Sequence, residues 1–368
     1  MDNRQRTQAV DMIPVPFATK FILSSEILGE DRTILVRVPE SYNRWTQRYP
    51  VLYMLDGELP LFTSHAGVIT QLSEWESRIP EMILVGIPNT DRPRDMLPKG
   101  IELPNGRIHG GGADAFLSFL TDELVPTIET EFRTQPYRLL SGTSASGLAV
   151  AHALVTGMHG FGAFFASSPT VGTCERELFG RAEMAGLGDE TRKFFAIFSG
   201  DDDMEGVQKD CDDFAELLRK VGGPALDVRH WVHEDEGHCP FDGFRRSLLA
   251  LHEHWTPSDE IIESGLDGVQ AHYEALSEQY GYTIELPVSA YESIAERMID
   301  SDRADTAIEL LQVGLERYAH AARIVFYLVI ALARSERRDE ARKLLEDALT
   351  VDRPGNNRLQ QLMKHFSD

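Results

Sequence analysis

A serine stands at the apex of a turn that the sequence places between a strand and a helix. Residues 137–140 form an apolar run typical of a buried strand, and residues 148–154 are small and apolar, as in a packed helix. Between them, residues 142–147 read Gly-Thr-Ser-Ala-Ser-Gly, with Ser144 at the point of a tight turn. Such a nucleophile elbow lifts the serine hydroxyl above a sheet edge and aims the next N–H at a reacting carbonyl.

The elbow departs from the usual Gly-x-Ser-x-Gly pattern, because Ser146 stands where the last glycine is expected. Glycine is used there since strand and helix approach closely, and serine is among the smallest substitutes. The alternative is an ordinary serine-rich turn in which Ser144 or Ser146 caps a helix. An acid and a histidine in the right order would favour the elbow.

Both partners follow in the order Ser, acid, His. Residues 194–200 predict a strand that ends in three aspartates, of which Asp203 fits a Gly-x-x-Asp spacing best and Asp202 next. The last predicted strand contains His233, and the loop beyond it carries His238, which we therefore take as the base. A histidine removes the proton from a serine that is otherwise a poor nucleophile, and a carboxylate orients the histidine. The alternative for the aspartates is a solvated turn that caps the following helix.

An oxyanion hole needs two backbone N–H donors aimed at the developing charge. We expect Ala145 to supply one donor and Glu58 the other, with Gly57 permitting the close approach. A looser, water-mediated hole is the alternative. Cys239 lies beside the histidine, but no glycine turn presents it as a nucleophile.

Composition limits the class of protein. The chain has 368 residues, enough for two domains, and 36 Lys and Arg against 59 Asp and Glu give a net charge of −23. This charge argues against nucleic acid and anionic membrane partners. No apolar run near the amino end resembles a secretory signal and none approaches a membrane span, so we expect a cytoplasmic protein. The three cysteines are widely spaced and suggest neither a disulfide framework nor a zinc site.

About eight predicted strands alternate with helices, which is typical of an α/β fold with a mostly parallel sheet covered on both faces. They lie at residues 22–28, 33–38, 49–55, 82–87, 137–140, 162–166, 194–199 and 227–233. The first two form a predicted hairpin that turns at residues 29–31, and Pro126 should kink or restart the helix over residues 114–132. In such sheets, functional sites lie beyond the carboxyl ends of the strands.

The composition changes after residue 255, and a helical repeat follows. Residues 305–311 recur at 339–345, an offset of 34 residues that is typical of tetratricopeptide repeats; two unrelated amphipathic helices are the alternative. We expect this module to pack on the main domain, where it would wall the cleft or form a homodimer. The predicted divisions are an N-terminal segment 1–19, an α/β-hydrolase domain 20–256, a linker and helix 257–284 and a tetratricopeptide-like module 285–368.

Several segments together resemble the putative esterase family of α/β-hydrolases, closest to its siderophore-esterase-like branch. They are residues 49–57, 85–95, 111–119, 123–129 and 137–142. The resemblance implies an α/β-hydrolase fold with an eight-stranded sheet, hydrolysis of carboxylic esters by Ser144 with His238 and an acid near Asp203, and no metal or cofactor. Arg94 is either an anion-binding group or one half of a structural ion pair. Trp75 is expected in the core, or less readily in an acyl pocket.

We therefore expect a serine esterase acting on a small-molecule ester through an acyl-enzyme. One alternative is an acyltransferase on the same triad. The other is a catalytically silent protein that binds a partner through its C-terminal repeats.

Overall fold

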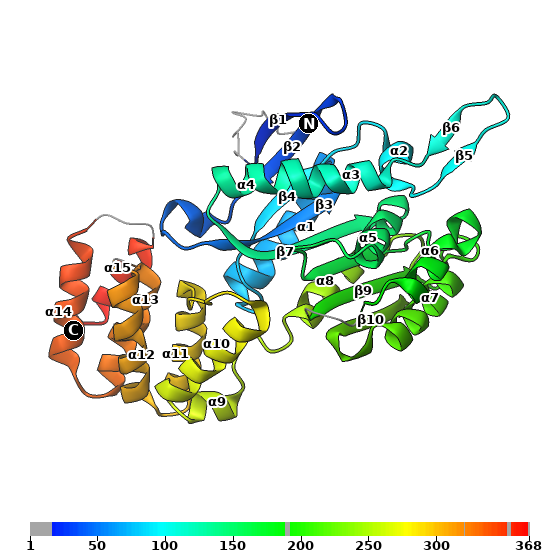
Figure 1. Ribbon diagram of the computed structural model, residues 1–368. Helices are drawn as coiled ribbons and strands as arrows, with labels where there is room; N and C mark the ends of the chain where they lie inside the picture. Colours follow the sequence, from blue (N-terminus) through cyan, green and yellow to red (C-terminus); the bar gives the residue numbers. More distant parts are fainter. Residues whose placement is uncertain (1–16, 188–191, 320, 352–354, 367–368) are drawn as a thin grey trace, which may run out of the picture.

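The protein is an α/β fold joined to a bundle of helices (Figure 1). The computed structural model describes residues 17–187, 192–319, 321–351 and 355–366; most of the predicted N-terminal segment lies outside them. The eight-stranded sheet has the order β1-β2-β4-β3-β7-β8-β9-β10. Its strands are β1 Thr19–Ser25, β2 Glu30–Arg37, β3 Tyr49–Leu55, β4 Ile83–Ile87, β7 Thr134–Thr143, β8 Ala163–Ser167, β9 Lys193–Gly200 and β10 Leu226–His233. In this sheet β2 pairs antiparallel with both β1 and β4, and the remaining described pairs are parallel, which confirms the predicted fold class.

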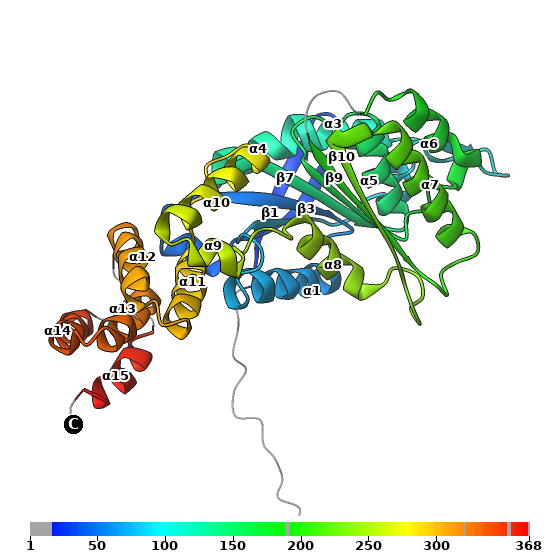
Figure 2. The ribbon, with the colours of Figure 1, turned by 90° about the horizontal axis from the view of Figure 1, so that it is seen from below.

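Helices cover both faces of the sheet, as the apolar strands require. All seven residues of β3 are buried, with Leu52 and Met54 on one face and Val51, Tyr53 and Leu55 on the other. One face is covered by α1 Leu59–Thr70 and α8 Phe241–Leu251 (Figure 2). The other carries α2 Arg92–Met96, α3 Ala113–Phe119, α4 Val125–Glu131, α5 Ala145–Val155, α6 Thr173–Met184 and α7 Val207–Val221. Pro126 lies in the first turn of α4, after a π-helical turn, Leu120–Leu124, that joins α3 to α4.

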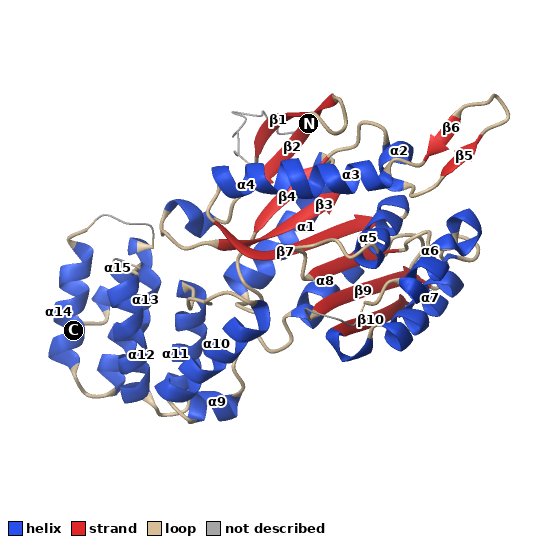
Figure 3. Cartoon of the chain, in the orientation of Figure 1, coloured by secondary structure: helices blue, strands red, loops and turns tan. Residues whose placement is uncertain are grey.

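In the described part of the C-terminal region, every element of secondary structure is a helix (Figure 3). Its helices are α9 Asp259–Glu263, α10 Leu266–Tyr280, α11 Val288–Asp300, α12 Ala304–Arg317, α13 Ala322–Arg334, α14 Arg338–Leu349 and α15 Asn356–Lys364. The repeated segments fall on α12 and α14, where Ala307 and Ala341 occupy matching, fully buried positions. The domain boundaries and the tetratricopeptide likeness stay predictions.

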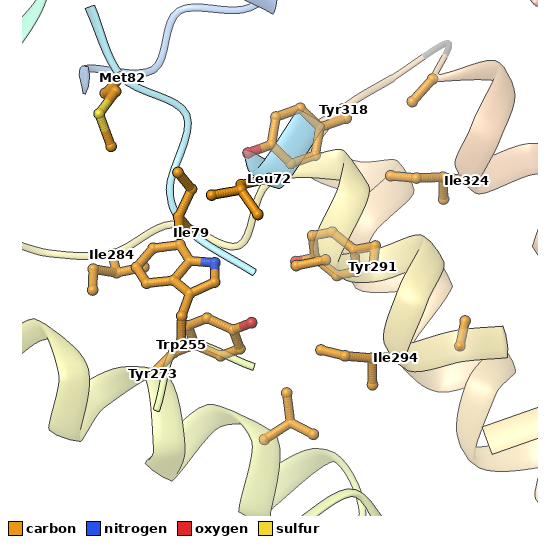
Figure 4. Close-up of a cluster of buried hydrophobic side chains, with 14 of the residues drawn as sticks. Leu72, Ile79, Met82, Trp255, Tyr273, Ile284, Tyr291, Ile294, Tyr318 and Ile324 are labelled. Atoms are coloured by element: carbon orange, nitrogen blue, oxygen red, sulfur yellow. The ribbon is translucent and has the colours of Figure 1, made fainter. Parts of the chain in front are cut away.

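The helical module packs against the end of the sheet where the parallel strands begin. The rings of Trp45 and Tyr318 lie 5.2 Å apart, those of Tyr137 and Tyr280 lie 5.1 Å apart, and the Tyr318 hydroxyl donates to Gln47. These partners precede β3 or lie in the first half of β7. A shared apolar cluster, shown in Figure 4, includes Leu72 and Ile79 of the main domain and residues of α10, α11 and α13. The expectation that this module walls the cleft is therefore wrong, because the cleft belongs at the opposite ends of the strands.

Two local expectations also differ from the structure. The β1–β2 hairpin turns at residues 26–29 rather than 29–31, because the Glu123 carboxylate accepts the N–H groups of Glu26 and Ile27. A small hairpin, β5 Gly100–Glu102 and β6 Ile108–Gly110, was not predicted. Among the described residues, no helix is both long and apolar enough to cross a membrane.

Candidate active site

Ser144 sits in a strained backbone conformation between β7 and α5. Its φ of 57° and ψ of −118° are rarely adopted by a residue with a side chain. Its N–H donates to the Ser167 carbonyl at 2.8 Å, which ties the turn to the end of β8. Strand and helix approach so closely that a Cβ on Gly142 would lie 2.6 Å from the carbonyl oxygen of Ser146. The local geometry is that of a nucleophile elbow.

Ser146 connects this elbow to the end of β3. Its hydroxyl lies 2.6 Å from Asp56 Oδ2 and 2.8 Å from the Thr143 carbonyl, and it accepts the Thr143 N–H at 2.7 Å. A second bond runs from the Thr143 hydroxyl to Asp56 Oδ2 at 3.0 Å. The serine that replaces the usual glycine therefore anchors the turn through its side chain.

Asp56 is the centre of a compact polar network. Arg92 donates to both of its oxygens at 2.8 Å and also to the Thr143 carbonyl at 3.0 Å, and the Asn89 amide donates to Oδ1 at 2.8 Å. Burial by itself would raise the pKa of Asp56, but the hydrogen bonds from Arg92, Ser146 and Asn89 outweigh it and hold the pKa below its ordinary value. Asp56 is thus an ionised clamp between the β3 loop and the elbow.

The clamp holds the loop from which an oxyanion donor was expected. A Cβ on Gly57 would lie 2.2 Å from the backbone nitrogen of Ile87, so only glycine fits there. Glu58 follows as the N-cap of α1, and its carboxylate accepts the Asn89 N–H at 2.9 Å. Ala145 is the first residue of α5. N–H groups at such helix starts have no partner within the helix and are available to an anion.

A histidine and a carboxylate meet at the same edge of the sheet, beyond β9 and β10. His238 Nδ1 lies 2.6 Å from Asp203 Oδ1. The Asp203 side chain is 1% exposed, whereas that of His238 is 27% exposed and open to a substrate. The Ser168 hydroxyl donates to Asp203 Oδ2 at 2.5 Å and accepts the Cys239 N–H at 2.8 Å. Ser168 therefore fastens the acid to the loop that carries the histidine.

Comparison with known proteins shows the family to which the chain belongs. Residues 25–236, more than half of the chain, match the family model described as "Putative esterase". The chain belongs to the putative esterase family. It is 31% identical over 144 residues to the ferri-bacillibactin esterase BesA of Bacillus subtilis, covering 33% of this chain and 48% of the relative. It is 26% identical over 169 residues to the siderophore triacetylfusarinine C esterase of Aspergillus fumigatus, covering 43% and 58%. The chain thus spans about half the length of these curated relatives.

Among solved structures, an IroE-like serine hydrolase from Shewanella oneidensis superposes with a TM-score of 0.71 at 26% identity. The match covers 80% of this chain and 97% of that chain. This match agrees with the resemblance to the esterase family and with the predicted fold.

The other residues considered as acid, base or nucleophile have different surroundings. Asp201 accepts the Glu236 N–H and the Asp202 N–H donates to the Glu236 carbonyl, so these two aspartates brace the histidine loop. His233 remains inside β10. Burial, aided by the charge of Asp203, raises the pKa of the Cys239 thiol to about 11, so the thiol is protonated at neutral pH.

Two other side chains have roles that differ from those considered in the sequence. Arg94 pairs with Glu30 and with Asp95, and the buried Asp95 also pairs with Arg32 at 2.6 Å, so the structural ion pair is the role that the contacts support. Trp75 is 76% exposed, and both expectations for it, core and acyl pocket, are wrong. It lies on a π-helical turn after α1 that points its ring outward.

Sequence reasoning missed the connecting roles of Asp56 and Ser168. Each directly follows a strand at the carboxyl edge of the sheet, and this placement was the available signal. Their hydrogen-bond partners come from segments more than thirty residues away, so no local pattern could identify them.

Proposed function

We propose that the protein is a carboxylic-ester hydrolase in which Ser144, His238 and Asp203 form a catalytic triad. The observation that carries the proposal is the Asp203–His238 hydrogen bond of 2.6 Å, at the same sheet edge as the strained Ser144 turn. Membership of the putative esterase family supports the reaction class.

The geometry supports a two-step mechanism. An ionised carboxylate can only accept a hydrogen bond, so Asp203 holds His238 as the Nδ1–H tautomer and leaves Nε2 to take the Ser144 proton. The serine oxygen attacks the ester carbonyl, and His238 returns the proton to the departing alcohol. Water, activated by the same histidine, then hydrolyses the acyl-enzyme and releases the acid.

The tetrahedral intermediates carry a negative oxygen, for which we assign the N–H groups of Ala145 and Glu58. The dipole of α5 adds positive potential at Ala145. The hydrogen bond between Asp56 and Ser146 links the Glu58 loop to the elbow, and it thereby fixes the position of one N–H donor relative to the other.

Hydrolysis of p-nitrophenyl esters by the wild type, Ser144→Ala and His238→Ala tests the proposal. We expect each variant to lose kcat by at least about 10⁴-fold, since triad members act as a unit. Ser64→Ala and His254→Ala are matched controls: Ser64 bonds the Leu61 carbonyl and His254 is 73% exposed. Both should keep wild-type turnover.

A wild type that neither hydrolyses any ester nor reacts with a fluorophosphonate probe would refute the proposal. Added alcohol acceptors separate the alternatives, because an acyltransferase would form a new ester faster than free acid. Capture of a partner by Ser144→Ala, without any ester turnover by the wild type, would instead favour a silent binding protein.

The names of the relatives suggest a small-molecule ester as the substrate, since both are siderophore esterases. We also propose a cytoplasmic location and a tetratricopeptide-like C-terminal module through which two copies associate. The repeat on α12 and α14 supports the module, and sedimentation of the full chain tests the dimer. The charge of −23 supports the expectation that neither nucleic acid nor an anionic membrane is a partner.

A further inference from the structure

A small cavity borders the turn that carries the proposed nucleophile. It has a volume of about 120 Å³, and its wall includes Gly142 and Thr143, the two residues before Ser144. Ser167, whose carbonyl accepts the Ser144 N–H, and Cys239, which follows His238, also line it. The cavity therefore borders the elbow and the histidine loop together.

Most of the remaining wall is apolar, with Ser141 and His65 as its polar side chains, and it includes residues of α1 and α8. Leu61 of α1 and Phe244 of α8 line it, as does Phe198 of β9. Phe241, at the start of α8, also lines the cavity and is 59% exposed. The cavity therefore reaches the surface near the loop that carries His238.

The described residues that line the cavity include no Asp, Glu, Lys or Arg. The titratable ring among them, His65, lies 3.8 Å from the Phe244 ring, and its Nδ1 lies 3.0 Å from the Leu61 carbonyl. Burial lowers the pKa of His65 to about 4, so this wall is uncharged at neutral pH. A charged group would enter without a counter-charge to replace its hydration.

The surroundings reinforce this selection against anions. The loops at residues 200–206 and 233–242 are rich in Asp and Glu and contain no Lys or Arg. The guanidinium of Arg92, near the elbow, is already paired with Asp56. An anionic acyl chain would therefore meet like charge outside the cavity and an uncharged wall within it.

We propose that this cavity is the acyl-binding subsite and that it selects a short, uncharged acyl chain of about four to six carbons; this inference rests on the proposed esterase function. A cavity of about 150 Å³ holds a benzene molecule, so one of this size takes a short aliphatic chain and excludes long ones.

The test measures hydrolysis of p-nitrophenyl esters from acetate to dodecanoate. The p-nitrophenyl hemisuccinate, whose four-carbon acyl chain ends in a carboxylate, is the anionic counterpart of the butyrate ester. Each methylene buried in the subsite should raise kcat/KM about fourfold, so butyrate should exceed acetate about fifteenfold. The rate should fall beyond hexanoate, and the hemisuccinate should react at least about a hundredfold more slowly than butyrate.

Substitutions at Leu61 should move this profile in opposite directions. Leu61→Trp fills the cavity and should bring the butyrate-to-acetate ratio close to one, whereas Leu61→Ala should shift the optimum to longer chains. Thr63→Trp, on the exposed face of the same helix, is the matched control and should keep the wild-type profile. Thermal unfolding and fluorophosphonate labelling of each variant establish that fold and nucleophile are intact.

The two proposals fail in different ways. An active wild type with an optimum at decanoate or longer, or folded Leu61 variants with an unchanged profile, would overturn the subsite while leaving the esterase in place. No turnover and no labelling of the wild type would refute the esterase proposal and the subsite with it.

Discussion

Replacing Ser146 by alanine should weaken both the fold and the reaction, although serine is the residue that departs from the usual elbow pattern. Ser146→Ala removes a hydrogen bond of 2.6 Å to the ionised Asp56 and the acceptor for the Thr143 N–H. A hydrogen bond to a charged group contributes about 1.5–3 kcal/mol, and an unpaired, partly buried N–H costs about 1 kcal/mol more. The higher helix propensity of alanine offsets about 0.5 kcal/mol of this loss in stability. The free energy of unfolding should therefore fall by about 2–3.5 kcal/mol.

The same change should lower kcat, because Asp56 directly precedes the loop of Glu58. With one of its links to the elbow removed, that loop holds the oxyanion donor less firmly, and small displacements of a catalytic group cost large factors in rate. We expect kcat to fall about tenfold or more, with a smaller change in KM, since the donor acts on the transition state rather than on the bound ester.

Urea denaturation and p-nitrophenyl butyrate kinetics measure the two effects. Ser64→Ala, which removes a hydroxyl that donates to the Leu61 carbonyl and lies 3.4 Å from His65 Nδ1, is the control and should cost less than about 1 kcal/mol. A double-mutant cycle with Asp56→Asn isolates the pair and should give a coupling above about 1 kcal/mol. The reasoning would be refuted if the free energy of unfolding of Ser146→Ala lay within about 0.5 kcal/mol of the wild-type value, or if the double-mutant cycle showed no coupling energy.

Three further predictions follow from single positions. Asp203→Asn should lower kcat about 10⁴-fold because the amide no longer fixes the histidine tautomer, whereas Asp202→Asn should stay within about twofold; equal losses in steady-state kinetics would contradict this. Gly57→Ala places a Cβ 2.2 Å from backbone and should lower kcat by about a hundredfold or more, while Gly67→Ala, with nothing within 4 Å, should keep full activity. Burial raises the pKa of Glu81 in the folded state to about 7, above the pKa of this group in the unfolded chain. Protonated Glu81 therefore stabilises the fold at low pH, and this contribution is lost as the pH rises through 7. Glu81→Gln should therefore gain stability relative to the wild type at pH 8 but not at pH 4.5 in urea titrations, and an equal difference at both pH values would argue against the shift.

Much of the fold could be predicted from sequence because its signals are local. The strand at Tyr49–Leu55 is apolar throughout, which identifies a strand buried on both faces, and alternation with helices identifies a mostly parallel sheet. That topology brings the ends of β7, β9 and β10 to one edge. The candidates Ser144, Asp203 and His238 could therefore be named before any coordinates, because their types and chain order match a known chemistry.

Other features depended on partners distant in the chain. The hairpin after β1 turns where it does because Glu123 accepts its N–H groups. The position of the helical module at the amino ends of the strands depends on rings such as Tyr318 meeting Trp45. Periodicity identifies which face of a helix is apolar, but it does not identify the surface that this face will cover.

The sequence by itself determined the order of the elements and the types of the reactive groups, since both follow from local hydrophobic pattern and turn chemistry. Tertiary structure alone decided that Asp203, among three consecutive aspartates, bonds His238, and that Ser146 bonds Asp56. The physical reason is that a carboxylate or hydroxyl has many acceptable partners, and only packing brings one within 3 Å while excluding the others.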